Sequence, residues 1–297
     1  FEFKNYFIAV FRDGKSDLQY SSNLPKPLYG ANVSYRWLNV GFSLALPKLS
    51  VANTNFEESK GFSLSISPIL RKFYFRNFYE EYRGYRLLNP EATTTQTSEA
   101  EFPELKTQTF HLTAYHGFNH QRFSYRNLIF QNEQQKKSAG SILAGISGGF
   151  KWINSSADKP FVPDSVGRTN PRSITGLEYF NIGINLGYAY TFVVHENFNA
   201  SGMLVPGLQY LDGIYKFHDG SHQKIDTKLG LNAEFRIQLG YNSKKFFGGI
   251  SFSSYLLSNW IKETAPVGSF HNYIRFNVGY HFHIKPIKFL KPVGLSN

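Results

Sequence analysis

The feature that most constrains this chain is a two-residue alternation of large apolar with small or polar side chains. In residues 180–194 every second residue is apolar or aromatic, while the positions between them are Gly, Asn, Ala and Thr as far as residue 191. The alternation recurs over 229–241 and 274–284, and more briefly in an early hairpin at 29–46. Successive side chains of a β-strand point to opposite faces, so these segments are predicted to be strands with one apolar face. No comparable 3.6-residue pattern occurs, so the chain is predicted to be all-β with minor helix at most.

Two β architectures show such alternation, namely a soluble sandwich and a transmembrane barrel. Sandwich strands usually run about 5–6 residues, whereas several alternating segments here are 13–15 residues long. The second face is rich in Gly, Asn and Ser, which suits a crowded barrel lumen better than a solvated sheet face. Aromatic residues that suit a headgroup layer lie near strand ends, at Trp37, Trp152, Tyr210, Tyr241 and Tyr273. A transmembrane antiparallel up-and-down β-barrel is therefore favoured.

Fourteen segments are candidate strands, and the second is short and rich in Ser, so the predicted number is 12–14. We predict one barrel domain over residues 1–284, followed by a basic periplasmic tail at 285–297 that carries three Lys. The candidate strands are 3–11, 17–22, 28–37, 39–47, 61–69, 71–82, 106–117, 121–131, 138–152, 178–195, 198–210, 227–242, 245–257 and 272–284.

The lengths of the connecting segments predict which of them face outward. If the last strand runs inward, the long segments 153–177, 211–226 and 258–271 become outer loops, as expected for this class. Counting further back, however, places the long segments 48–60 and 83–105 on the inner side. Either one strand between 106 and 152 is miscounted, or the barrel has substantial loops at both ends.

Composition excludes several classes of function. The 297 residues contain no Cys, which excludes disulfides, Cys-ligated zinc, iron–sulfur clusters and thiol catalysis. No apolar run approaches 18 residues, which excludes a membrane-spanning helix. The net charge of +11 suits nucleic acid, lipid phosphate or an anionic solute. The aromatic residues follow the apolar stripe and not the basic residues, which disfavours nucleic-acid binding. No basic and apolar leader is present, so we expect any signal peptide to have been removed.

The chain offers few residues for catalysis or metal binding. The nearest nucleophile–base pairs are His111 with Thr113 and His218 with Ser221, and the second pair lies in a Gly-containing loop. His218, Asp219 and His222 are donors that suit a metal, but no helix aligns them, so a solvated loop is expected. We therefore predict no enzymatic activity, no metal site and no cofactor.

The strand phase divides the charged from the apolar side chains. A charge that faces lipid near the bilayer midplane costs about 2–4 kcal/mol, so charged residues should point into the lumen, where Glu234 and Arg236 are neighbours on one face and could pair. In a closed lumen, loop acids (Glu57, Glu58, Glu99, Glu101, Glu104) are expected to fold in and neutralise the wall. The predicted lumen-facing charges are Arg36, Lys72, Arg76, Arg122, Arg126, Lys151, Lys228, Glu234, Arg236 and Arg275. The predicted lipid-facing residues are Phe180, Ile182, Ile184, Leu186, Tyr188, Phe235, Ile237, Leu239, Phe276, Val278, Tyr280 and Phe282.

Two stretches resemble a known family. The block from Asn119 to Ser141, with Asn-His-Gln-Arg-Phe-Ser-Tyr-Arg at its start, and the hairpin from Tyr29 to Leu38 are similar to an uncharacterised family of Bacteroidota outer-membrane β-barrels, a domain of unknown function. The resemblance implies a precursor with a signal peptide and insertion into the outer membrane. The last strand, with Gly279, Tyr280 and Phe282, is similar to the C-terminal signal that the barrel-assembly machinery recognises in its substrates. The resemblance supplies no activity and no catalytic residue.

These observations lead to one expected function and two alternatives. We expect a non-enzymatic outer-membrane barrel that serves as a structural or accessory subunit of a larger envelope complex, with lipid and other envelope proteins as partners. The alternatives are a passive, anion-preferring channel and a soluble β-sandwich binding module.

Overall fold

In the computed structural model, the described residues are 2–12, 15–22, 28–45, 60–88, 101–163, 171–195, 197–226, 228–258 and 267–282. The tail 285–297 lies outside this range. The described residues form fourteen strands and one short helix, joined in one antiparallel sheet. The elements are β1 Glu2–Arg12, β2 Lys15–Ser22, β3 Leu28–Tyr35, β4 Leu38–Ala45, β5 Lys60–Leu70, β6 Phe73–Leu87, β7 Glu101–Gly117, α1 Tyr125–Phe130, β8 Ala139–Asn154, β9 Ile174–His195, β10 Phe198–Phe217, β11 His222–Lys224, β12 Leu229–Asn242, β13 Phe246–Ser258 and β14 Val267–Tyr280.

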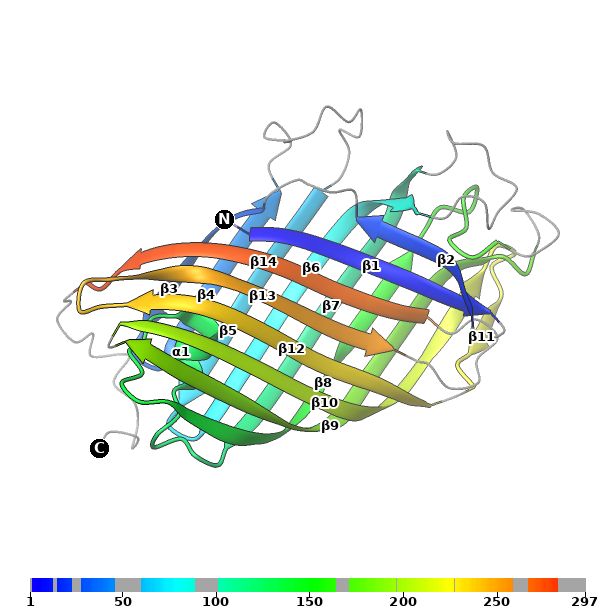
Figure 1. Ribbon diagram of the computed structural model, residues 1–297. Coiled ribbons are helices and arrows are strands. Elements are labelled where there is room, and N and C mark those ends of the chain that lie inside the picture. The colour runs from blue at the N-terminus through cyan, green and yellow to red at the C-terminus, as the bar shows by residue number, and fades with distance from the viewer. Residues whose placement is uncertain are drawn as a thin grey trace.

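The sheet closes on itself into a barrel (Figure 1), because β14 pairs with β1 and β9 pairs with both β8 and β10. This confirms the predicted all-β antiparallel barrel. The alternative of a soluble β-sandwich is wrong, since its two sheets would have open edges whereas this one sheet forms a closed circuit. No helix in the described part of the chain is long and apolar enough to span a membrane.

The two ends of the barrel differ in strand number. β2 and β3 lie one after the other along the same edge of β1, where Phe7 pairs with Ser21 and Glu2 pairs with Leu28. At one end β2 also pairs with β6, which closes a circuit of ten strands. At the other end the hairpin β4–β5 is inserted between β3 and β6, giving a circuit of twelve. We call these the ten-strand end and the twelve-strand end. The range of 12–14 therefore overestimates the ten-strand circuit, because β4 and β5 do not reach that end.

The predicted strand at 121–131 is wrong, because this segment contains the helix α1. Ser124 caps the helix by accepting a hydrogen bond from the Asn127 amide, and Gln131 ends it in the left-handed conformation with φ of 58°. Tyr125, Leu128 and Ile129 are buried together, at the i, i+3, i+4 spacing of a helix face. Alternation is ambiguous over such a short segment, so the strand pattern was misleading there.

This helix resolves the inconsistency in the loops. Without a strand crossing at 121–131, β4 and β5 have their 46–59 ends directed toward the ten-strand end. The strands flanking 89–100, 155–173, 218–228 and 259–266 end there. The short turns at 36–37 and 71–72 and the α1 segment lie at the twelve-strand end (Figure 1). Apart from the segment 118–138 with α1, the long connections of both halves thus have their flanking strand ends on one side of the barrel.

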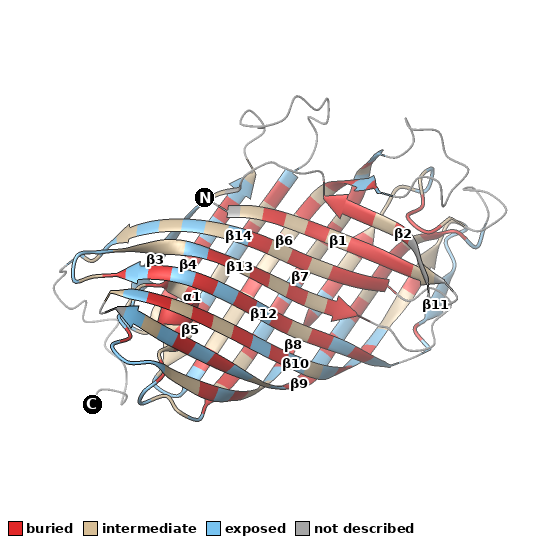
Figure 2. Cartoon of the chain, in the orientation of Figure 1, coloured by how far each residue is buried: buried red, intermediate tan, exposed pale blue. Residues whose placement is uncertain are grey.

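The outer face of the wall is apolar. All twelve residues predicted to face lipid are exposed on the outside, with exposed fractions from 37% for Phe235 to 90% for Val278. Figure 2 shows the alternation of buried and exposed residues along these strands. At the twelve-strand end, aromatic pairs lie at the ends of β10, β12, β13 and β14. The ring centroids are 5.0 Å apart for Phe198 and Tyr241 and 5.1 Å apart for Phe246 and Tyr280.

The interior of the barrel is filled in three layers. The ten-strand end holds an apolar and aromatic cluster that includes Ile8, Tyr20, Tyr85 and Phe161. The middle holds buried charged residues, and the twelve-strand end holds α1 and the side chains packed against it, such as Leu143 and Val205.

Candidate functional site

The middle layer of the lumen is a buried ionic network centred on Glu80. Lys4 donates to Glu80 over 2.6 Å between Nζ and Oε1, and the second carboxylate oxygen is 3.1 Å from Nδ1 of His271. The network continues through His271, whose Nε2 is 3.1 Å from Nζ of Lys151, and Lys151 also donates to the Ser269 hydroxyl. Lys4, Glu80, His271 and Lys151 are all buried. One carboxylate is therefore the acid of a layer that holds two ammonium groups.

A second network surrounds Glu234. Its carboxylate accepts hydrogen bonds from the Arg76 guanidinium and from the Tyr115 hydroxyl, the latter over 3.0 Å. Arg76 also donates to the Tyr273 hydroxyl, and its guanidinium lies over the rings of Phe78, Tyr255 and Tyr273 at 5.5–5.9 Å. The expected pair of Glu234 with Arg236 is wrong, because Arg76 reaches the carboxylate from the opposite wall of the barrel.

The plug, which we define as residues 118–138 with α1, is fixed to the wall by polar contacts. Gln238 donates to the Asn127 carbonyl over 3.1 Å, Asn242 donates to the Gln131 carbonyl over 2.7 Å, and Arg236 donates to the Ile129 carbonyl over 2.8 Å. The ring of Tyr125 stacks on Tyr74 with centroids 4.4 Å apart. The plug is therefore an integral part of the twelve-strand end.

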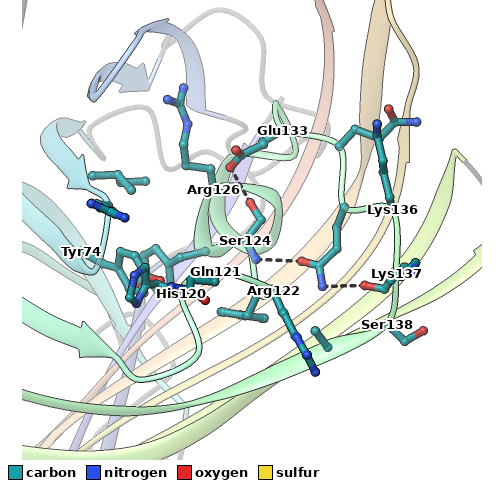
Figure 3. A pocket seen from close by; sticks show the side chains of 17 residues that line it. Tyr74, His120, Gln121, Arg122, Ser124, Arg126, Glu133, Lys136, Lys137 and Ser138 are labelled. Carbon is teal, nitrogen blue, oxygen red and sulfur yellow. Dashed lines mark hydrogen bonds between the residues drawn. The ribbon is translucent and has the colours of Figure 1, made fainter. Parts of the chain in front are cut away.

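A pocket of about 840 Å³ opens on the plug face (Figure 3). Its lining has five Lys and Arg residues and a single acid, Glu133. Glu133 and Gln135 both hydrogen-bond Ser124, and Gln135 also donates to the Lys137 carbonyl, so the strap 133–138 is held beside the helix. The basic lining residues are Arg71, Arg122, Arg126, Lys136 and Lys137. This basic plug pocket is suited to an anionic partner.

The structure divides the ten predicted lumen charges into two groups. Arg76, Lys151, Glu234, Arg236 and Arg275 lie on lumen-facing strand positions. The prediction that the other five face the lumen from the strands is wrong, because none of them lies on a strand. Arg36, Lys72 and Arg122 lie in turns, Arg126 lies on α1, and Lys228 lies just before β12. The alternation was extended too far past the strand ends, where side chains no longer follow the pleat.

Three of these five residues make contacts at the two rims. Arg126 donates to the Arg36 carbonyl, which joins the plug to the β3–β4 turn. Lys228 pairs with Asp212 over 3.5 Å and lies over the ring of Tyr210 on the outer side.

Sequence reasoning missed the acid at the centre of the lumen. Glu80 lies on the same alternating face of β6 as Arg76 and Phe78, so the strand phase itself contained the signal. Loop acids were expected to neutralise the wall instead, and Glu104 contradicts this, since it forms an exposed pair with Arg83. Glu57, Glu58 and Glu99 lie outside the described residues.

The two nucleophile–base pairs named from the sequence lie in different surroundings, one in the lumen and one in a loop. Thr113 and His111 are hydrogen bonded over 2.8 Å, but both are buried, and the His111 ring packs against Phe78 and Tyr255. A substrate has no access to this pair. In the loop 218–222, the Ser221 hydroxyl and amide hydrogen-bond Asp219 and hold the pKa of its carboxyl below the usual value. The described residues contain no cluster of three or more His, Cys, Asp or Glu that would hold a metal.

The closed antiparallel wall, its apolar outer face and the buried ionic layer inside it together define a β-barrel of the outer-membrane type. The family is shown by the sequence: the chain matches the family described as "Domain of unknown function (DUF4421)" over residues 3–282, and it belongs to this family. The match agrees with the resemblance seen at 29–38 and 119–141. No curated protein matches the chain.

Several solved structures are similar in fold. The outer membrane protease OmpT from Escherichia coli has a TM-score of 0.39 and 8% identity, covering 95% of this chain and 93% of that chain. The KdgM porin in complex with disordered oligogalacturonate has a TM-score of 0.29 and 7% identity, covering 95% and 100%. The CymD monoaromatic hydrocarbon channel has a TM-score of 0.24 and 7% identity, covering 95% and 88%. With TM-scores below 0.5, these similarities carry no argument about the activity of this chain.

Proposed function

We propose that this protein is a non-enzymatic, non-conducting barrel of the outer membrane that serves as an accessory subunit and docks a partner through the basic plug pocket. The observation that carries the proposal is the filled lumen: an apolar layer, an ionic layer and the plug follow one another along the axis. A barrel with such an interior has no path for a solute, so its wall and its two faces are the parts available for function.

The outer face supports the membrane location. A closed barrel satisfies its backbone hydrogen bonds without a lipid-exposed edge, and the exposed apolar stripe would be costly in water over so large an area. Short turns are typical of the periplasmic side, so the plug would face the periplasm. The family resemblance adds the expectation of a Bacteroidota outer membrane, reached by means of a removed signal peptide and the barrel-assembly machinery.

A matched pair of substitutions tests the membrane location. Ile184 and Val194 lie on the same outer face of β9 and are each 66% exposed, but Ile184 is central and Val194 is near the strand end. In lipid vesicles we expect Ile184→Arg to lower the free energy of unfolding by about 2–4 kcal/mol and Val194→Arg by about 0–1 kcal/mol. Denaturant titration, with heat-modifiable gel migration as the signal of folded barrel, measures both changes in the free energy of unfolding. Equal and small losses would show that the outer face is in contact with water.

Planar-bilayer recording tests the closed lumen. We expect the wild-type protein to show no steady conductance, because the apolar layer and the plug both block the axis. A stable anion-selective conductance that falls in Arg236→Ala would instead establish the passive channel and overturn the accessory role.

Charge reversal tests the docking face. We expect Arg122→Glu combined with Lys136→Glu and Lys137→Glu to weaken binding of a Glu-rich peptide at least tenfold, because three exposed positive charges of the pocket become negative. Fluorescence anisotropy measures the binding, and its salt dependence should flatten in the variant. Lys224→Glu is the control, since Lys224 is exposed on β11 at the opposite end. Unchanged binding in the triple variant would remove the pocket from the proposal.

A further inference from the structure

A small cavity lies inside the barrel between the plug and the ionic layer. It has a volume of about 50 Å³ and is bounded by the C-terminal end of α1, by β5 and β6, and by β12 and β14. Its charged lining consists of Lys4, Arg76, Arg236 and Arg275 with one acid, Glu80. The rest of the lining is polar at Ser63, Ser65, Ser67 and Asn32 and aromatic or apolar at Phe78, Ile129, Phe130 and Tyr273.

The two buried carboxylates of the lumen already have hydrogen-bond and ion-pair partners. Both oxygens of Glu80 are occupied, one by Lys4 and one by His271. Glu234 is bound by Arg76 and Tyr115. Among the described residues, these are the buried carboxylates.

Arg236, like Lys151, is a buried cation for which the described part of the chain shows no ion pair, and of the two it is Arg236 that lines this cavity. Its side chain is buried, and its guanidinium donates from Nη2 to two neutral acceptors, the Ile129 carbonyl over 2.8 Å and the Ser251 hydroxyl over 3.3 Å. Its Nε is buried without a hydrogen-bond partner. A buried charge is unfavourable unless it is paired and its donors are satisfied.

We propose that this cavity is a binding site for a small inorganic anion of the halide class, with Arg236 as its principal ligand and Arg76 and Arg275 beside it. Three guanidinium groups, with the Ser67 hydroxyl and the Asn32 amide beside them, suit an anion. A single water needs about 10–15 Å³ of such space, so the cavity of about 50 Å³ has room for a halide with a few waters and is too small for a large organic anion such as gluconate. The anion would be a resident part of the lumen and would fix the wall to the plug. This role is separate from the docking of a partner at the basic plug pocket.

Bromide provides a direct probe, because its anomalous X-ray scattering identifies its position. In crystals of the wild-type protein in bromide, we expect an anomalous peak in the cavity, within contact distance of the Arg236 guanidinium. Arg236→Gln should lose this peak, whereas Arg122→Gln, on the exposed rim, should keep it. Peaks confined to exposed Lys and Arg, or a peak unchanged in Arg236→Gln, would overturn the proposal.

A solution measurement covers the case in which Arg236→Gln fails to fold. At constant ionic strength, replacing gluconate by chloride should slow the thermal unfolding of the wild-type barrel in detergent at least tenfold, because an anion that binds the folded state stabilises it by mass action and gluconate is too large to enter. Arg122→Gln should respond to chloride in the same way as the wild type. An unfolding rate that is the same in both salts would contradict the site.

Discussion

Replacing Glu80 by Gln is expected to lower the free energy of unfolding by about 3–5 kcal/mol, the usual effect of removing one partner of a buried ion pair. The carboxylate of Glu80 is bonded to Lys4 and His271, and through His271 to Lys151. Gln keeps the shape but removes the charge, which leaves two buried ammonium groups in a layer without their acid. Denaturant titration in lipid vesicles, with heat-modifiable migration as the signal of folded barrel, measures the loss.

The neighbouring acid provides the control for this experiment. Glu81 points to the outer side of the same strand and pairs with Lys106 over 2.9 Å, with both side chains about one-third exposed. Exposed pairs contribute about 0–1 kcal/mol, so Glu81→Gln should change the free energy of unfolding little. If the two variants lose equal amounts, the lumen network does not stabilise the barrel in the way described.

Replacing Phe161 by Ala is expected to lower the free energy of unfolding by about 3–5 kcal/mol, as for other fully buried Phe residues. Phe161 follows β8, is fully buried in the apolar layer of the ten-strand end, and its carbonyl accepts a hydrogen bond from Tyr20. Truncation leaves a cavity among the buried side chains of this cluster. The same denaturant titration measures the effect.

Phe192→Ala is the matched control, because Phe192 lies on the outer face of β9 and is 54% exposed. There the truncated side chain is replaced by lipid or detergent and leaves no void, so a much smaller loss is expected. A loss for Phe161→Ala no larger than for Phe192→Ala would mean that the ten-strand end is loosely packed and that the lumen is open at this end.

The alternation determined the fold class and the outer face of the wall. Side-chain direction in a strand is a local property with a period of two, so residues such as Ile184 and Leu239 could be placed without knowledge of their neighbours. The same rule placed Lys151 and Glu234 on lumen-facing positions, where the structure also has them. It failed at Arg36 and Lys72, where the strand ends in a turn, and at 121–131, where a six-residue helix is too short to show its period.

The tertiary structure alone decided which charges pair, how many strands close each end and what fills the lumen. Glu80 meets Lys4 from 76 residues away and His271 from 191 residues away, and Arg76 meets Glu234 across 158 residues. Such contacts depend on barrel closure and on strand register, which a local pattern does not contain. The sequence by itself therefore determined a barrel with an apolar outside, whereas closure brought distant side chains together into the ionic layer, the plug pocket and the cavity at Arg236.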